Sequence, residues 1–240
     1  LKDDHSRLLT LTEWFKILVE LKEGGVLYLI FIGGEAMLSP HFWPIAEQAK
    51  KLGFDLSLIT NGLKIKRLDV AQKLKQVGFR HVTFSLYSLD PKIHDELTNT
   101  QGSQVRTMQA IDFCREAGLE VGINCLLTYK NIEGYFALAD WCIDRNLEIK
   151  VDPNVTPKFG GGLGPTRLRA SKGQLFEFYR RGAKKWTRAL PQGQKFQSED
   201  YVCNAAKGKC SITPYGDLLS CIEIREPLGN LKNQSFKEAW

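Results

Sequence analysis

The chain has 240 residues, of which 43% are hydrophobic and 25% are charged, and its formal net charge at pH 7 is +6. This balance excludes intrinsic disorder and collagen-like architectures, and because Lys and Arg are interspersed with acidic residues, it gives no indication of nucleic-acid binding. No apolar stretch reaches the roughly 18 to 20 residues of a membrane-spanning helix and LKDDHSR does not resemble a secretory signal, so we expect a cytoplasmic protein without a membrane anchor.

The predicted secondary structure begins with a helix, because four apolar residues recur at helical spacing before Gly24-Gly25. These residues are Trp14, Ile17, Leu18 and Leu21. From residue 26 to residue 151, short apolar or β-branched runs alternate with longer amphipathic stretches, which is the pattern of strands and helices in strict turn. The predicted strands are residues 26–31, 55–60, 81–86, 121–127 and 147–151.

Four helices between these strands have recognisable limits, since each follows a residue that can cap a helix start. The expected starts are Ser39-Pro40, Asp90-Pro91, Ser103 and Asn131. The helices that begin near Ser39, Ser103 and Asn131 are expected to end at Gly53, Gly118 and about Asn146. Because parallel neighbours need a crossover and that crossover is a helix, the alternation predicts an α/β fold with parallel strands.

Polar or glycine residues follow the first three predicted strands, where the ligands of parallel α/β proteins bind, whether the sheet is open or a barrel. The candidate cofactor-binding residues are Gly33, Gly34, Glu35, Thr60, Asn61 and Ser85. Two glycines let a ligand approach free backbone N–H groups, and Glu35 offers an acceptor for an ammonium group. A ligand with an amine and a carboxylate would suit these strand ends. The alternative is that the residues have only structural roles, as two tight turns and a strand-end hydroxyl with a protein partner.

Taken together, these segments resemble the core of the radical S-adenosylmethionine superfamily. The resemblance rests on FIGGEAMLSP, LITNG, FSLYSLDPKIHDELTNTQGS and EAGLEVGINCLLTYKN, and it covers about residues 1–155. It implies a partial (β/α)6, TIM-like barrel in which the Gly33-Gly34-Glu35 segment contacts the amino group of the methionine part of the cofactor. A residue in the place of Ser85 contacts the ribose or carboxylate region. Ala36 stands where the family most often has proline, which alters the stiffness of the loop.

The family binds its reactive [4Fe-4S] cluster through a CxxxCxxC loop after the first barrel strand, and this spacing does not occur in the 240 residues. The segment LKDDHSRLLTLTEW resembles the part of the family's chain that lies just after that loop. Two interpretations are open: the first strand and the cluster loop precede the sequence given, which we favour, or the chain is a degenerate relative without the cluster.

Three cysteines are crowded near the end of the chain: Cys203, Cys210 and Cys221. Thiolates suit iron-sulfur clusters or zinc, and because three ligands do not complete a four-coordinate site, a fourth would come from elsewhere. The alternative is three free thiols in a surface loop. By contrast, Cys114, Cys125 and Cys142 fall on predicted helices or a strand and are expected in the core.

The end of the chain also resembles the opening of a SPASM/twitch extension. Cys203, twelve residues, Gly216, four residues and Cys221 reproduce its spacing, and Cys210 has the place of an additional ligand. The resemblance implies one or two auxiliary [4Fe-4S] clusters. The expected division is a barrel over residues 1–155, a linker and helix over residues 156–200, and the start of the extension over residues 201–240.

The function implied is that of a radical enzyme that generates a 5′-deoxyadenosyl radical from S-adenosylmethionine and abstracts hydrogen from a peptide or protein. Its electron donor would be a small reductant protein such as flavodoxin or ferredoxin. Three alternatives remain: a radical enzyme that acts on a small molecule such as a tetrapyrrole, a clusterless peptide-binding relative, and an unrelated barrel enzyme with a zinc-bound tail.

Overall fold

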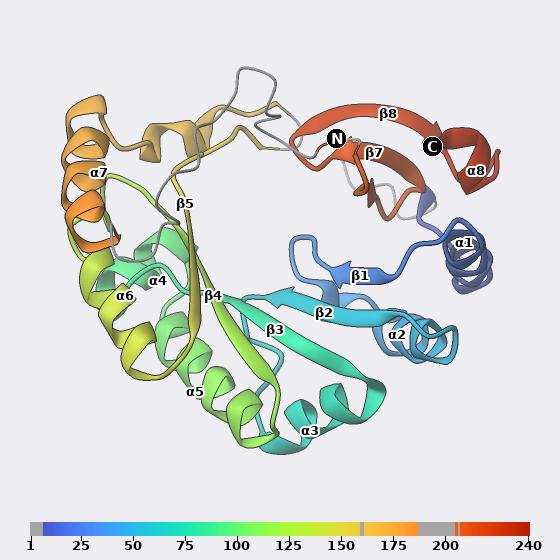
Figure 1. Cartoon of the computed structure of the whole chain (residues 1–240), viewed down its shortest axis with the longest axis horizontal. Coiled ribbons are helices and arrows are strands. Elements are labelled where there is room, and N and C mark those ends of the chain that lie inside the picture. The colour runs from blue at the N-terminus through green and yellow to red at the C-terminus, as the bar shows by residue number, and fades with distance from the viewer. Residues whose placement is uncertain (1–6, 159–160, 187–204, 206) are drawn as a thin grey trace.

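The main body of the protein is a curved parallel sheet with helices along its outer side, as a computed structural model shows (Figure 1). The structure describes residues 7–158, 161–186, 205 and 207–240. The strands of this sheet, in spatial order, are β1 (Tyr28–Phe31), β2 (Asp55–Thr60), β3 (Phe79–Ser85), β4 (Glu120–Leu126) and β5 (Glu148–Asp152). The long helices are α1 (Leu11–Glu23), α2 (Phe42–Lys51), α3 (Leu68–Val77), α4 (Pro91–Thr98), α5 (Ser103–Glu116), α6 (Tyr135–Asp144) and α7 (Lys172–Trp186).

All neighbouring strands of this sheet are parallel and lie in chain order, which confirms the predicted α/β fold with a partial, TIM-like barrel. Within the described part of the chain, β1 and β5 each pair on one side only, so the barrel stays open. Leu56, Phe84 and Ile123 are buried beneath the helices and form part of the core. Because side chains alternate along a strand, the inner face instead carries polar residues such as Ser57 and Thr83.

The caps predicted at Asp90-Pro91, Gly53 and Gly118 are confirmed, but the cap predicted at Ser39 is wrong. Helix α2 begins only at Phe42, and the Ser39 hydroxyl accepts a hydrogen bond from the His41 amide at 3.2 Å. The reason is a short 3-10 helix over Ala36–Leu38, which occupies the segment between the first strand and α2.

The caps predicted at Ser103 and Asn131 are also wrong, because tertiary partners take these side chains. Gly102 precedes α5, and the Ser103 hydroxyl donates to Asp95 at 2.9 Å; the same carboxylate accepts the Gln104 amide at 2.9 Å and so caps α5 from the preceding helix. Asn131 is buried three residues before Gly134, the residue that precedes α6.

A second, antiparallel sheet lies at the α1 end of the main body, where α1 contacts the helix that follows this sheet (Figure 1). It consists of β6 (Ser211–Ile212), β7 (Asp217–Cys221) and β8 (Ile224–Asn230), followed by the short helix α8 (Phe236–Ala239). Several hydrogen bonds join this unit to the main body: the Phe236 amide donates to Glu20 of α1 at 2.7 Å, and the Leu9 amide donates to the Pro214 carbonyl at 2.8 Å. The boundaries at residues 155 and 200 stay predictions. None of the helices in the described ranges is both long and apolar enough to cross a membrane.

Candidate active site

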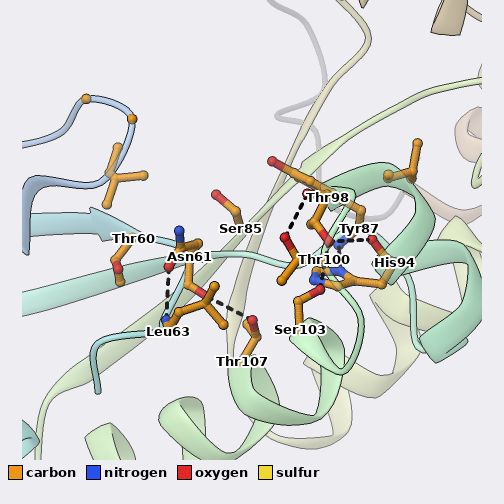
Figure 2. Close-up of a pocket in the computed structure, with 14 residues that line it drawn as sticks. Thr60, Asn61, Leu63, Ser85, Tyr87, His94, Thr98, Thr100, Ser103 and Thr107 are labelled. Atoms are coloured by element: carbon orange, nitrogen blue, oxygen red, sulfur yellow. Dashed lines mark hydrogen bonds between the residues drawn. The ribbon is translucent and has the colours of Figure 1, made fainter. Parts of the chain in front are cut away.

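A cavity of about 320 Å³ opens at the carboxyl ends of β2 and β3 (Figure 2). Five of the six predicted site residues line it: Gly33, Gly34, Thr60, Asn61 and Ser85. The sixth, Glu35, contacts two of them directly through hydrogen bonds to Thr60 and Asn61. Three segments that are far apart in the sequence therefore meet at one mouth of the sheet, as the parallel topology requires.

Glu35 ties the loop after β1 to the end of β2. The Thr60 hydroxyl donates to its two oxygens at 2.9 and 2.8 Å, the Asn61 amide donates at 3.0 Å, and the Met37 amide donates at 3.3 Å. A carboxylate has about four lone-pair sites, so these three donor groups leave room for one more. The geometry can therefore accommodate the predicted ammonium partner while Glu35 also holds the loop in place.

The Gly33-Gly34 segment forms an open edge of the cavity. Gly33 has a φ of +138°, in the region that favours glycine, and a Cβ atom added at either residue would meet no other atom within 4 Å. Both residues are exposed. The free space beside this backbone fits the close approach of a ligand to its amide groups.

Asn61 presents a hydrogen-bond donor at the floor of the cavity. Its side-chain oxygen accepts from the Leu63 amide at 2.9 Å, and Figure 2 shows its amide nitrogen on the other side of the group. The backbone carbonyl of Asn61 accepts the Thr107 hydroxyl at 2.8 Å, which fixes the loop from α5. The conformation of Asn61 is thus set by its protein partners, and the amide nitrogen is left for a ligand.

The opposite wall of the cavity comes from α4, α5 and the loop between them, and sequence reasoning missed it. Its polar residues are His94, Thr98, Thr100, Ser103 and Thr107. The available signal was the spacing of Ser103 and Thr107, which places two hydroxyls on one face of α5, but nothing in that spacing tells which face meets the strand ends.

None of the residues that line the cavity is Asp, Glu, Lys or Arg, and the Glu35 carboxylate reaches its edge through Thr60 and Asn61. Burial lowers the pKa of His94 below its usual value, with nearby Asp95 acting in the opposite direction. Burial also raises the pKa of Tyr87, whose hydroxyl interacts with that of Ser85. Both side chains are therefore uncharged at neutral pH, and what they offer to the cavity is hydrogen-bonding groups.

The cysteines divide as the sequence indicates. Cys114, Cys125 and Cys142 are buried in the core, as predicted, and burial raises the pKa of each thiol to about 12. Cys210 and Cys221 are free and half-buried in the second sheet, at the start of β6 and the end of β7.

The predicted metal site in the tail stays a prediction. Cys203 lies outside the described residues. The pairing of Ser211 with Leu219 brings Cys210, the residue before Ser211, alongside the end of β7, which carries Cys221. Across the described ranges, no three His, Cys, Asp or Glu residues are grouped as metal ligands.

Comparisons with known proteins identify the family and the fold. Residues 2–142 match the family described as the radical SAM superfamily. A PqqA peptide cyclase from Streptomyces rochei is 26% identical over 250 aligned positions, which cover 97% of this chain and 67% of the relative.

Two solved structures share the fold. SuiB of Streptococcus suis bound to the precursor peptide SuiA has a TM-score of 0.76 at 20% identity, over 97% of this chain and 58% of SuiB. The enzyme anSMEcpe with bound AdoMet and Kp18Cys peptide has a TM-score of 0.72 at 16% identity, over 95% of this chain and 71% of anSMEcpe. The chain thus spans little more than half the length of SuiB. With more than half of its residues matched by the family, the chain belongs to the radical SAM superfamily.

Proposed function

We propose that this chain binds S-adenosylmethionine in the cavity between β2, β3 and α4 and belongs to an enzyme that modifies a peptide or protein. The observation that carries the proposal is the convergence of Gly33-Gly34, Glu35, Asn61 and Ser85 at one mouth of the sheet. The residues named above would hold the cofactor, which would supply radical chemistry for hydrogen abstraction once a reduced cluster gives it an electron.

The described residues fit the amino-acid part of such a cofactor. The open backbone edge at Gly33-Gly34 admits it, and the remaining lone pair of Glu35 is an acceptor for its ammonium group. Asn61 and Ser85 offer polar atoms at the floor of the cavity. The role of these residues is to bind and orient, and to replace water around the reacting group. The CxxxCxxC ligands of the radical-generating cluster are not among the 240 residues.

The proposed substrate class rests on the relatives. The curated relative is described as a peptide cyclase, and two structural neighbours have bound peptides. We propose a peptide or protein as the substrate, and a small reductant such as flavodoxin or ferredoxin as the electron donor. A cytoplasmic location is part of this proposal, because iron-sulfur ligands stay reduced in that compartment.

Binding of the cofactor tests the proposal directly. Glu35→Ala in the full-length protein removes the carboxylate that would accept the ammonium group and that also holds the Asn61 amide. We therefore expect the affinity for S-adenosylmethionine to fall by about tenfold or more. Isothermal titration calorimetry measures it, with Glu47→Ala, an exposed carboxylate on α2, as the control. Unchanged affinity in Glu35→Ala would contradict the assignment.

For the tail, we propose that Cys203, Cys210 and Cys221 contribute ligands to one or two auxiliary [4Fe-4S] clusters. The support is the spacing of the three residues and the proximity of Cys210 to the end of β7. After anaerobic reconstitution, Cys203→Ala or Cys221→Ala should lose the iron and visible absorbance of one cluster, whereas Cys114→Ala, in the core, should retain both. Protein that takes up zinc and no iron would contradict this.

A further inference from the structure

A hydrogen bond fixes which ring nitrogen of His94 carries the proton. The residue lies on α4, is 1% exposed and lines the cavity. Its Nδ1 atom accepts a hydrogen bond from the Tyr87 amide at 3.1 Å. An N–H donor requires a lone pair on its partner, so Nδ1 carries no proton, and in the neutral ring the proton is on Nε2.

The Nε2–H group is directed to the cavity. Within the described part of the chain, the hydrogen bond to Tyr87 is the one bond that the His94 ring makes. In the same ranges, every fully buried side-chain nitrogen or oxygen has a partner. Since Nε2 has none, it is not sealed in the protein and borders the space that the ring lines.

The hydroxyl groups around His94 donate their protons to protein atoms, so they can only accept hydrogen bonds from a ligand. Thr107 donates to the Asn61 carbonyl at 2.8 Å, and Ser103 donates to Asp95 at 2.9 Å. Thr98 donates to the His94 carbonyl at 3.1 Å, and Thr100 donates to the Thr98 carbonyl at 3.1 Å. This wall therefore combines hydroxyl lone pairs with one N–H donor.

A group that both accepts and donates hydrogen bonds matches such a wall. A sugar hydroxyl does so, because its oxygen accepts from Nε2–H and its proton goes to a hydroxyl lone pair. A carboxylate accepts only and would face lone pairs without a cation, since the cavity has no charged lining residue.

We propose that His94 positions the ribose of the bound cofactor, through a hydrogen bond from Nε2–H to a ribose hydroxyl oxygen. This inference rests on the proposed function, because it assumes that the cavity takes S-adenosylmethionine. It adds a residue of α4 to the binding site built from the strand ends, and it makes recognition of the nucleoside independent of charge.

Two substitutions separate the two nitrogens of the ring. In His94→Asn, the side-chain oxygen can replace Nδ1 as the acceptor for the Tyr87 amide, but nothing replaces Nε2–H. In His94→Gln, the longer amide can present an N–H group near the position of Nε2. The probes are S-adenosylmethionine and 5′-methylthioadenosine, which keeps the ribose but lacks the amino-acid part. Affinities are measured by calorimetry on the full-length protein.

We expect His94→Asn to weaken both ligands by about five- to tenfold, the loss of one hydrogen bond, and His94→Gln to stay within about twofold of wild type. Equal affinity of His94→Asn and wild type for both ligands would overturn the proposal. Weaker S-adenosylmethionine binding with unchanged 5′-methylthioadenosine binding would also overturn it, since His94 would then contact the amino-acid end. If the wild type binds neither ligand, the proposed function itself fails.

A measurement on the wild type covers the case in which His94→Asn does not fold. The ¹⁵N shifts of the His94 ring report which nitrogen carries the proton. A protonated Nε2 whose shift moves on addition of 5′-methylthioadenosine supports the proposal. A protonated Nδ1, or an Nε2 shift that the ligand leaves unchanged, contradicts it.

Discussion

The two sheets of the protein differ in whether protein contacts fix the orientation of the side chains that a ligand would meet. At the mouth of the parallel sheet, Glu35, Asn61 and His94 each have a protein partner that sets their orientation. In the antiparallel sheet, Cys210 and Cys221 are free thiols near one strand end. We therefore expect the cavity to be preorganised before its ligand binds, and the cysteine site to gain its geometry from the metal.

The difference arises from the packing of each sheet. The parallel sheet is covered by helices, and its core includes the fully buried Leu56 and Phe84. The antiparallel sheet contributes only a few residues, such as Leu218, to the same core and leaves Ile224 and Leu228 about half exposed. Substitutions that remove the orienting contacts should therefore lower the free energy of unfolding most at the parallel sheet.

The largest effect is expected for Asn131→Ala. The Asn131 side chain accepts from the Thr128 amide at 2.7 Å and donates to the carbonyls of Tyr87 and Leu126 at 2.8 and 2.9 Å, so it joins the ends of β3 and β4. Its loss leaves buried backbone groups unpaired, which should lower the free energy of unfolding by roughly 3 kcal/mol. Denaturant unfolding measures this.

Asn154→Ala is the control for that variant, because Asn154 is exposed and follows β5. Its free energy of unfolding should stay within about 0.5 kcal/mol of wild type. A loss of under about 1 kcal/mol in Asn131→Ala would show that water replaces these hydrogen bonds, and that the strand ends are less preorganised than we infer.

One glycine in each region has a left-handed backbone, so the same substitution to alanine can be compared in the two regions. Gly62 beside the cavity and Gly216 in the small sheet have φ values of +79° and +89°, and a Cβ atom would lie 3.1 Å from Phe84 in the first and 3.1 Å from Asn230 in the second. The left-handed backbone alone makes alanine unfavourable by about 1 to 2 kcal/mol at either site.

The two alanine variants should nevertheless differ in how much of the protein they destabilise. We expect Gly62→Ala to lower the global unfolding free energy by about 2 kcal/mol, since the rigid ring of Phe84 cannot yield easily. Gly216→Ala should speed hydrogen exchange in β7 and β8 while β2 and β3 keep their protection. Loss of protection in both sheets for Gly216→Ala would mean that the sheets unfold as one unit.

The sequence predicted the strand-end half of the cavity because topology alone brings those residues together. Parallel strands end at the same edge, so Gly33, Asn61 and Ser85 could be placed without coordinates. The half of the cavity that includes His94 depends on how α4 and α5 pack. Local patterns carry no such information, and for the same reason they predict a helix cap at Asn131 instead of the contact between strands that the structure has.

One of the hydrogen bonds between the two regions gives a smaller effect. Glu20 of α1 accepts the Phe236 amide at 2.7 Å. Glu20→Ala should lower the free energy of unfolding by only about 1 kcal/mol, because the site is partly exposed. Hydrogen exchange at the Phe236 amide should rise markedly, and exchange in β3 should not. Glu23→Ala, exposed on the same helix, is the control, and equal exchange at Phe236 in both variants would show that this hydrogen bond does not hold α8 against α1.

The smallest effect is a pH dependence of the free energy of unfolding that arises from His94, beside the parallel sheet. Burial lowers the pKa of His94 in the folded state, so between its folded and unfolded values the unfolded chain binds a proton that the folded chain does not. The free energy of unfolding should therefore fall as the pH drops below about 6.5, the usual histidine value.

His94→Asn removes that proton uptake while it keeps an acceptor for the Tyr87 amide. Between pH 7.5 and about 5.5, where most carboxylates stay ionised, its unfolding free energy should fall less steeply than that of the wild type. Parallel slopes in the two proteins would mean that the imidazole is protonated as easily in the folded chain as in water. In that case the His94 ring would be cationic in mildly acidic solution, and the wall formed by α4 and α5 would no longer be the uncharged wall from which we infer recognition of a sugar hydroxyl.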